Sequence, residues 1–193
     1  MTVSLILNFL IIIANIYCLE WGLKHAKPRW SFFMYFTTLS NLLCAAASAA
    51  VFIAWHYGEP PMWTLVFKYV GTCAVTVTML TVLLFLGPFS QDWKAVMGWP
   101  ELVMHAVCPA LAIVSFLFFE KRAMPALVIA LGALPVLLYA GLYLYKVVYA
   151  PKGRRWKDFY GFNTGGKWPI SCVVMLTAAG LIAFALWAIN NGR

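Results

Sequence analysis

Long apolar runs separated by short polar connections form the dominant pattern of this sequence. Most runs reach the roughly 20 residues that a helix needs to cross a hydrocarbon core about 30 Å thick. The pattern predicts six transmembrane helices, at about 3–20, 31–55, 65–86, 101–119, 125–149 and 168–189. Because these runs fill the chain, we expect an all-α polytopic membrane protein, with residues 1–193 forming one transmembrane helical domain whose consecutive helices pack antiparallel.

The first run, from Val3 to Leu19, is expected to be a membrane helix and not a removable signal peptide. No basic residue precedes it, no small-residue cleavage site is present, and another apolar run follows. A secretory signal peptide has a basic segment before its apolar run and a small-residue cleavage site after it. The third run is expected to stop at Gly87 and Pro88, which disfavour helix continuation.

The composition excludes an ordinary soluble domain, since 64% of the residues are hydrophobic and only 10% are charged. The net charge of +8 could suggest nucleic acid, but the basic residues lie in the connections, where they orient a membrane protein. The five cysteines lie singly within apolar runs, without the paired spacing of a zinc or redox motif. We therefore expect free buried thiols, no metal or other cofactor, and no nucleic acid partner.

Basic residues are distributed unequally between the two sides of the predicted bundle. The first, third and fifth connections with their flanks hold Lys24, Lys27, Arg29, Lys94, Lys146, Lys152, Arg154, Arg155, Lys157 and Lys167. The other side holds Lys68, Lys121, Arg122 and Arg193. By the positive-inside rule, this bias predicts that both termini lie outside and that the odd-numbered connections lie in the cytoplasm.

Two further segments carry structural expectations. Residues 45–50 form a small-residue surface that would let another helix approach closely. The fifth connection, residues 150–167, is too long for a simple turn and could fold over the cytoplasmic end of the bundle. This connection could act as a lid over the bundle, or it could form a basic patch that binds anionic lipids.

Polar side chains within the apolar runs are the first place to look for function, because they are costly in hydrocarbon. Thr37 and Asn41 lie one turn apart in the second run, and His105 lies in the fourth run between Glu101 and Pro109. Pro109 lacks the N–H that would bond the His105 carbonyl, so we expect a kink there. Thr37 lies about six residues and His105 about four residues past the expected helix starts, roughly 6 to 9 Å deep on the same side.

At that depth a hydroxyl and an imidazole could meet the ester of a membrane lipid. His105 would accept the Thr37 proton, the Thr37 oxygen would attack the carbonyl carbon, and water would later release the acyl group. Asn41 could orient a group or donate to the oxyanion. An equally simple interpretation is that these side chains only form hydrogen bonds between helices.

Other polar residues in the runs have simpler interpretations. Thr72 and Thr76 share one stripe and are expected to form interhelical hydrogen bonds. Lys68 lies near a helix end, from which its long side chain could reach the interface. No Asp, Lys or Arg marks an ion path inside the runs beyond Lys68 and Lys146 near helix ends, which disfavours a proton pump or an ion channel. The outer halves of the second and fourth helices look apolar, which disfavours a transporter.

Three segments resemble those of a known family of membrane hydrolases. Tyr35-Phe36-Thr37 followed by Ser40-Asn41, together with His105-Ala-Val-Cys-Pro109, resembles the androgen-induced and androgen-dependent TFPI-regulating proteins and related small six-helix bacterial membrane proteins. The resemblance implies a bacterial inner-membrane protein that cleaves lipid acyl esters, such as fatty-acid esters of hydroxy fatty acids. By matching position it implies Thr37 as nucleophile and His105 as base, with the neighbouring Thr38 as the alternative nucleophile.

Three hypotheses follow. The leading one is an intramembrane lipid hydrolase that uses Thr37 and His105, supported by Asn41, on an ester that enters from the bilayer. The second is a non-catalytic membrane protein that binds a lipid or a protein partner. The third is a small transporter that uses the same polar pocket.

Overall fold

The computed structural model describes residues 1–89 and 97–192, and the described part is helical with no strand. Five of the described helices are long and apolar enough to cross a membrane, while a further apolar helix, Val103–Phe119, is shorter. The long α-helices are α1 (Thr2–His25), α2 (Phe36–Tyr57), α3 (Met62–Thr81), α7 (Val128–Leu144) and α8 (Trp168–Asn191). The shorter apolar helix contains α6 (Cys108–Val114) between two π-helical turns, η3 (Val103–Val107) and η4 (Ser115–Phe119).

Further short segments extend or connect these helices. The π-helix η2 (Val82–Leu86) and the short α4 (Gly87–Phe89) follow α3, and the π-helix η5 (Tyr145–Tyr149) follows α7. Three 3₁₀ segments lie in connections: η1 (Arg29–Met34), η6 (Lys152–Arg154) and η7 (Thr164–Gly166). The predicted all-helical architecture is confirmed, with five helices of spanning length among the described residues.

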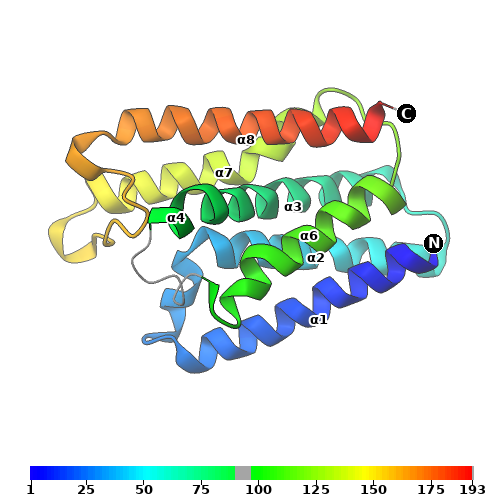
Figure 1. Cartoon of the computed structure of the whole chain (residues 1–193), viewed down its shortest axis with the longest axis horizontal. Helices are drawn as coiled ribbons and strands as arrows, with labels where there is room; N and C mark the ends of the chain where they lie inside the picture. The colour runs from blue at the N-terminus through cyan, green and yellow to red at the C-terminus, as the bar shows by residue number, and fades with distance from the viewer. Residues whose placement is uncertain (90–96, 193) are drawn as a thin grey trace.

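Consecutive helices run antiparallel, and both termini lie at one end of the bundle, which we call the terminal end (Figure 1). The connections 26–35 and 150–167 lie at the opposite end, which we call the loop end (Figure 1). α3 lies at the centre, where it contacts α2, α6, α7 and α8. The expectation of sequential antiparallel packing is therefore confirmed for α1 with α2, α2 with α3, α3 with α6 and α7 with α8, whereas α7 follows α6 in the chain but packs mainly against α3 and α8.

The boundary expected at residue 31 is wrong, because the second apolar run does not begin as one continuous α-helix. Pro28 precedes the 3₁₀ segment η1, and Tyr35 is extended, with φ −92° and ψ 135°. α2 begins only at Phe36. Thr37 is therefore in the first turn of its helix, and the expected depth of about six residues inside it is wrong.

Close contact between α2 and α3 depends on small residues at their crossing. A Cβ atom on Gly71 would lie 2.9 Å from the Cα atom of Cys44 and 3.3 Å from the Cβ atom of Ala47. Ala47 and Ser48 are completely buried. The prediction that residues 45–50 let another helix approach is thus confirmed, although Ala49 and Ala50 line a groove instead.

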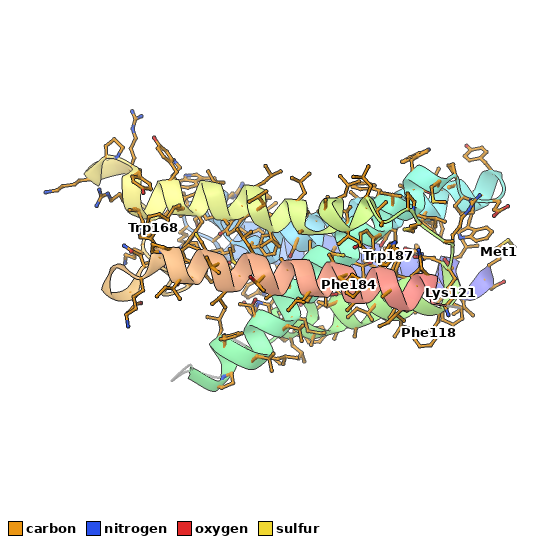
Figure 2. The ribbon with its side chains drawn as sticks, turned by 90° about the horizontal axis from the view of Figure 1, so that it is seen from above. Met1, Phe118, Lys121, Trp168, Phe184 and Trp187 are labelled. Atoms are coloured by element: carbon orange, nitrogen blue, oxygen red, sulfur yellow. The ribbon has the colours of Figure 1, made fainter. Side chains whose placement is uncertain are left out.

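The outer surface of the bundle is apolar. Ile6 of α1, Leu138 of α7 and Val173 of α8 are each more than half exposed, at 55%, 65% and 66%. Trp168 lies at one end of α8 and Trp187 lies toward the other end (Figure 2). This arrangement fits a protein whose solvent is hydrocarbon in the middle and headgroups at both ends.

All five cysteines are free, as predicted. Four of them are buried and Cys172 is half-buried. Of the basic residues that were used to predict orientation, Lys94 and Arg193 lie outside the described residues.

Candidate functional site

The first turn of α2 carries the predicted nucleophile. The backbone carbonyl of Thr37 accepts hydrogen bonds from Ser40 Oγ at 3.1 Å and from Asn41 Nδ2 at 2.9 Å. The Thr37 side chain is half-buried, whereas Thr38 and Asn41 are buried. Thr37 is thus the more accessible of the two adjacent threonines.

Asn41 links this turn to the helix that carries His105. Its Nδ2 atom also donates to the backbone carbonyl of Met104 at 3.0 Å. His105 is the next residue, half-buried within the π-helix η3. The structure therefore brings α2 and η3 into contact at Asn41, one turn from Thr37 and one residue from His105.

The π-helix explains why a side chain can bond this carbonyl. The N–H of Cys108 bonds the carbonyl of Val103, five residues earlier. One residue further in the same register, the carbonyl of Met104 would pair with the nitrogen of Pro109, which has no N–H. Asn41 supplies the missing donor. The carbonyl that Asn41 bonds is therefore that of Met104, and the expectation that Pro109 leaves the His105 carbonyl available stays a prediction.

The connection 150–167 packs across the loop end of α2 and α7. The hydroxyl of Tyr143 donates to Asp158 Oδ1 at 2.9 Å, and the N–H of Phe36 donates to the hydroxyl oxygen of Tyr160 at 3.0 Å. Asp158 also accepts hydrogen bonds from the backbone N–H groups of Phe162 and Asn163. A residue of the connection thus caps the N-terminus of α2, next to Thr37, as an N-cap side chain would.

The electrostatic environment of Tyr160 keeps this cap neutral. Burial raises the pKa of Tyr160 to about 12, because a phenolate would lose its hydration, even though the N–H of Phe36 favours the charged form. The Tyr160 hydroxyl is therefore un-ionised at neutral pH.

Thr72 and Thr76 do not form the predicted interhelical hydrogen bonds. Thr72 Oγ bonds the carbonyl of Lys68 at 2.8 Å, and Thr76 Oγ bonds the carbonyl of Thr72 at 2.7 Å. Threonine within a helix commonly bonds the carbonyl four residues earlier, which satisfies the hydroxyl locally. The interhelical hydroxyl contact of α3 is instead between Thr78 and Ser40, at 2.8 Å.

A second polar cluster lies near the terminal end, where an apolar interior was expected. Lys68 is completely buried, and its Nζ atom donates to Asn8 Oδ1 at 2.7 Å and to Ser48 Oγ at 2.8 Å. Glu120 is 3% exposed and accepts hydrogen bonds from Ser4 Oγ at 2.8 Å, Ser115 Oγ at 2.6 Å and Asn8 Nδ2. The expectation that Lys68 reaches the interface is wrong, because its side chain has partners inside the bundle.

The sequence contained a signal for this cluster. Ser4 and Asn8 lie one turn apart in the first run, and Asn15 and Cys18 continue the same buried face of α1. Glu120 follows the apolar run directly, at the end of the expected fourth helix. Combining a polar stripe on one helix with a charged residue at each of two helix ends would have predicted the cluster.

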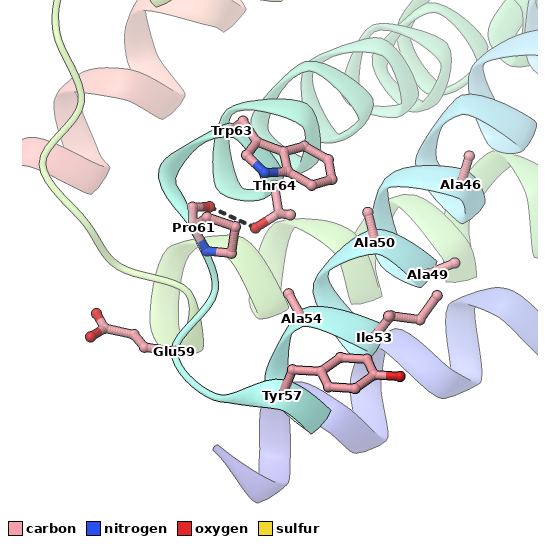
Figure 3. A pocket seen from close by; sticks show the side chains of 10 residues that line it. All are labelled: Ala46, Ala49, Ala50, Ile53, Ala54, Tyr57, Glu59, Pro61, Trp63 and Thr64. Atoms are coloured by element: carbon pink, nitrogen blue, oxygen red, sulfur yellow. Dashed lines mark hydrogen bonds between the residues drawn. The ribbon is translucent and has the colours of Figure 1, made fainter.

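An apolar groove with a volume of about 690 Å³ lies between α2 and α3 (Figure 3). Figure 3 shows the small side chains of Ala46 and Ala50 along one side and Trp63 on the other. Thr64 in its wall bonds the carbonyl of Pro61 at 2.7 Å. Neither Thr37 nor His105 lines this groove, so it offers no support for the predicted site.

Among the described residues, no group of three His, Cys, Asp or Glu side chains could hold a metal ion. No protein-family model, no curated protein and no solved structure matches this chain.

Proposed function

We propose that this protein is an intramembrane hydrolase of lipid acyl esters, with Thr37 as nucleophile and His105 as general base. The observation that carries the proposal is the pair of hydrogen bonds from Asn41 Nδ2, to the Thr37 carbonyl at 2.9 Å and to the Met104 carbonyl at 3.0 Å. These bonds fix the turn that bears Thr37 against the π-helix that bears His105. π-Helical turns within α-helices occur frequently at functional sites.

The proposed reaction has two steps. In the first, neutral His105 takes the proton of the Thr37 hydroxyl while the oxygen bonds to the ester carbonyl carbon. The bond from that carbon to the alcohol oxygen then breaks, and the departing alkoxide receives the proton from His105. In the second step His105 deprotonates water, which attacks the acyl-threonine, so that a carboxylic acid leaves and Thr37 regains its proton.

The proposed substrate follows from where the site lies and from the family resemblance. The turn that bears Thr37 is near the loop end, and the surrounding helix surfaces are apolar. An ester whose acyl chains remain in the bilayer could reach it from the side. The resemblance of Tyr35-Phe36-Thr37, Ser40-Asn41 and His105 to the androgen-dependent TFPI-regulating proteins favours fatty-acid esters of hydroxy fatty acids.

The topology that goes with this proposal is a six-helix bundle in a bacterial inner membrane. Val103–Phe119 would be the sixth span, shorter than the others but apolar. Both termini would lie outside and the connection 150–167 in the cytoplasm, in agreement with its exposed basic residues Lys152, Arg154, Arg155, Lys157 and Lys167.

Turnover of a panel of acyl esters by the purified protein in nanodiscs tests the proposal. The panel includes a fatty-acid ester of a hydroxy fatty acid, and Thr37→Ala and His105→Ala are compared with wild type. Thr38→Ala and the exposed His25→Ala serve as matched controls. We expect Thr37→Ala and His105→Ala to lose about 10²-fold or more in activity, the size of a lost base or nucleophile, and the controls to retain it.

The alternative functions predict different results from the same preparation. If no ester is hydrolysed but a lipid binds intact, a non-catalytic lipid-binding role replaces the proposal. If vesicles that contain the protein accumulate a solute, a transporter role replaces it. If Thr38→Ala abolishes turnover and Thr37→Ala does not, the nucleophile is misassigned.

A further inference from the structure

The buried cluster at the terminal end has the composition of a charge pair and not of a neutral network. One oxygen of Glu120, Oε1, accepts hydrogen bonds from three donors, Ser4 Oγ, Ser115 Oγ and Asn8 Nδ2. An oxygen that receives three donors is best matched by an ionised carboxylate. On the other side of Asn8, the amine of Lys68 donates to two acceptors, Asn8 Oδ1 and Ser48 Oγ.

Asn8 is oriented as a bridge between a cation and an anion. Its amide oxygen faces Lys68 Nζ at 2.7 Å, and its amide nitrogen faces Glu120. The positive end of the amide dipole thus points to the carboxylate and the negative end to the ammonium. Both ionised groups are stabilised by this arrangement, which a neutral amine and a neutral acid would not require.

The second carboxylate oxygen, Glu120 Oε2, is buried and has no hydrogen-bond partner among the described residues. Each other polar side-chain atom of this cluster that is named above has a partner within it. An unpartnered carboxylate oxygen beside a satisfied one is a position at which a proton can add without displacing an existing donor.

We propose that Glu120 is a reversible proton-binding site, whose ionised form neutralises Lys68 inside the membrane and holds the first turns of α1 in the bundle. On acidification, a proton from water at the terminal end bonds to Oε2 and converts the carboxylate to a carboxylic acid. The Lys68 ammonium is then left without its counter-charge. Because Ser4 and Asn8 make their interhelical contacts to this carboxylate, the beginning of α1 is held less firmly.

The site is close to water at the terminal end. Glu120 is followed by the exposed Lys121 and Arg122, and Ser4 is preceded by three exposed residues. Lys121 and Met1 lie at the same end of the molecule (Figure 2). A proton therefore has a short path from the aqueous face to Oε2.

Few other titratable groups face the cluster. Lys68 reaches it from α3, and the Cys44 thiol interacts with Ser48 from α2. On the surface of the same end, Glu59 pairs with Arg122 at 3.6 Å, and His56 is exposed. Among the described residues, Glu120 is thus the only buried carboxylate at this site.

Infrared difference spectroscopy of the full chain in nanodiscs tests the proposal independently of any ester hydrolysis. We expect acidification to produce the carbonyl band of a buried carboxylic acid in wild type, and Glu120→Gln to abolish that band. Glu59→Gln is the matched control, because Glu59 is at the same end but its side chain is 77% exposed. In Lys68→Met the band is expected already at neutral pH, since the counter-charge is gone.

Hydrogen exchange at neutral pH tests the coupling to α1. Glu120→Gln, which mimics the protonated form, is expected to exchange the amides of residues 2–10 faster than wild type, whereas Glu59→Gln is not. The proposal is overturned if the carboxylic acid band is present in wild type at neutral pH, or if Glu120→Gln leaves the acid-induced band unchanged. Equal exchange in Glu120→Gln and wild type would overturn the coupling. If Lys68→Met does not fold, the comparison of wild type, Glu120→Gln and Glu59→Gln still tests both proton binding at Glu120 and its coupling to α1.

Discussion

Asn41 and Met104 are 63 residues apart in the sequence, and the side chain of one bonds the backbone carbonyl of the other at 3.0 Å. The bond exists because two local irregularities coincide. The π-helix shifts the carbonyl register, and Pro109 removes the N–H that would complete it. A buried amide on α2 then bonds a backbone carbonyl in another helix, which holds the turn that bears Thr37 against the π-helix that bears His105.

Replacing Asn41 by leucine removes both hydrogen bonds and leaves the Met104 carbonyl buried without a donor. We expect the free energy of unfolding to fall by about 1–3 kcal/mol and ester turnover to fall with it. Ser40→Ala is the control, since it removes the hydroxyl contact to Thr78 but keeps the link between α2 and η3. Thermal unfolding in detergent and ester turnover are measured on both variants. Full turnover in Asn41→Leu would show that the link is unimportant for the reaction.

The close crossing of α2 and α3 gives a prediction about glycine. In Gly71→Ala the new methyl group would lie 2.9 Å from the Cys44 Cα atom, and backbone cannot move aside cheaply. We expect a loss of about 1–3 kcal/mol, typical of overpacking. Gly180→Ala in α8 has no atom within 4 Å of its new methyl group and should be neutral or slightly stabilising. Unfolding of the two variants by denaturant compares them directly, and equal stability would contradict the assigned packing.

The sequence was sufficient to predict the helical architecture, because apolar runs of spanning length have few alternatives. It was less informative about where helices begin. The apolar residues Phe32, Phe33 and Met34 continue the second run, yet the extended Tyr35 separates them from α2. Hydropathy does not distinguish a 3₁₀ turn from the first turn of an α-helix, so the position of Thr37 in its helix was misjudged.

The Tyr160 hydroxyl that caps α2 is expected to ionise only at strongly alkaline pH. Its pKa is raised from 10 to about 12 in the folded protein, so the stability that it contributes is complete below pH 10 and is lost as the pH rises toward 12. We expect the difference in tyrosinate absorbance between wild type and Tyr160→Phe to appear near pH 12. A difference that appears near pH 10 would mean that the Tyr160 hydroxyl is not buried against Phe36.

The site itself was only partly accessible from the sequence. Thr37, Asn41 and His105 could be singled out, because polar residues are rare in the runs. The contact through Met104 could not, because it depends on a π-helical register that no residue pattern specifies. The cluster at Lys68 was missed because a lysine near a helix end usually extends to the interface. Its burial depends on partners in two other helices, Asn8 of α1 and Ser48 of α2, and Asn8 in turn bonds Glu120.

Substitutions of Lys68 and Glu120 should not be additive. Glu120→Gln leaves the Lys68 ammonium buried without its counter-charge, and Lys68→Met removes the cation that keeps Glu120 ionised. Each single substitution is expected to cost about 3–5 kcal/mol. The double variant removes both charges, and its loss of stability is expected to be smaller than the sum of the single losses by at least about 1 kcal/mol. Chemical denaturation of the four proteins measures this coupling. Additive losses would show that the two charges do not stabilise each other.

Mass spectrometry of the trapped acyl-enzyme tests the central claim most directly. The protein in nanodiscs is incubated briefly with an activated long-chain acyl ester, quenched in acid and digested. We predict that one acyl group is found on the peptide that contains Thr37, that it is absent from Thr37→Ala, and that it accumulates more slowly in His105→Ala. An adduct confined to another residue, or none while ester is being hydrolysed, would contradict a Thr37 nucleophile.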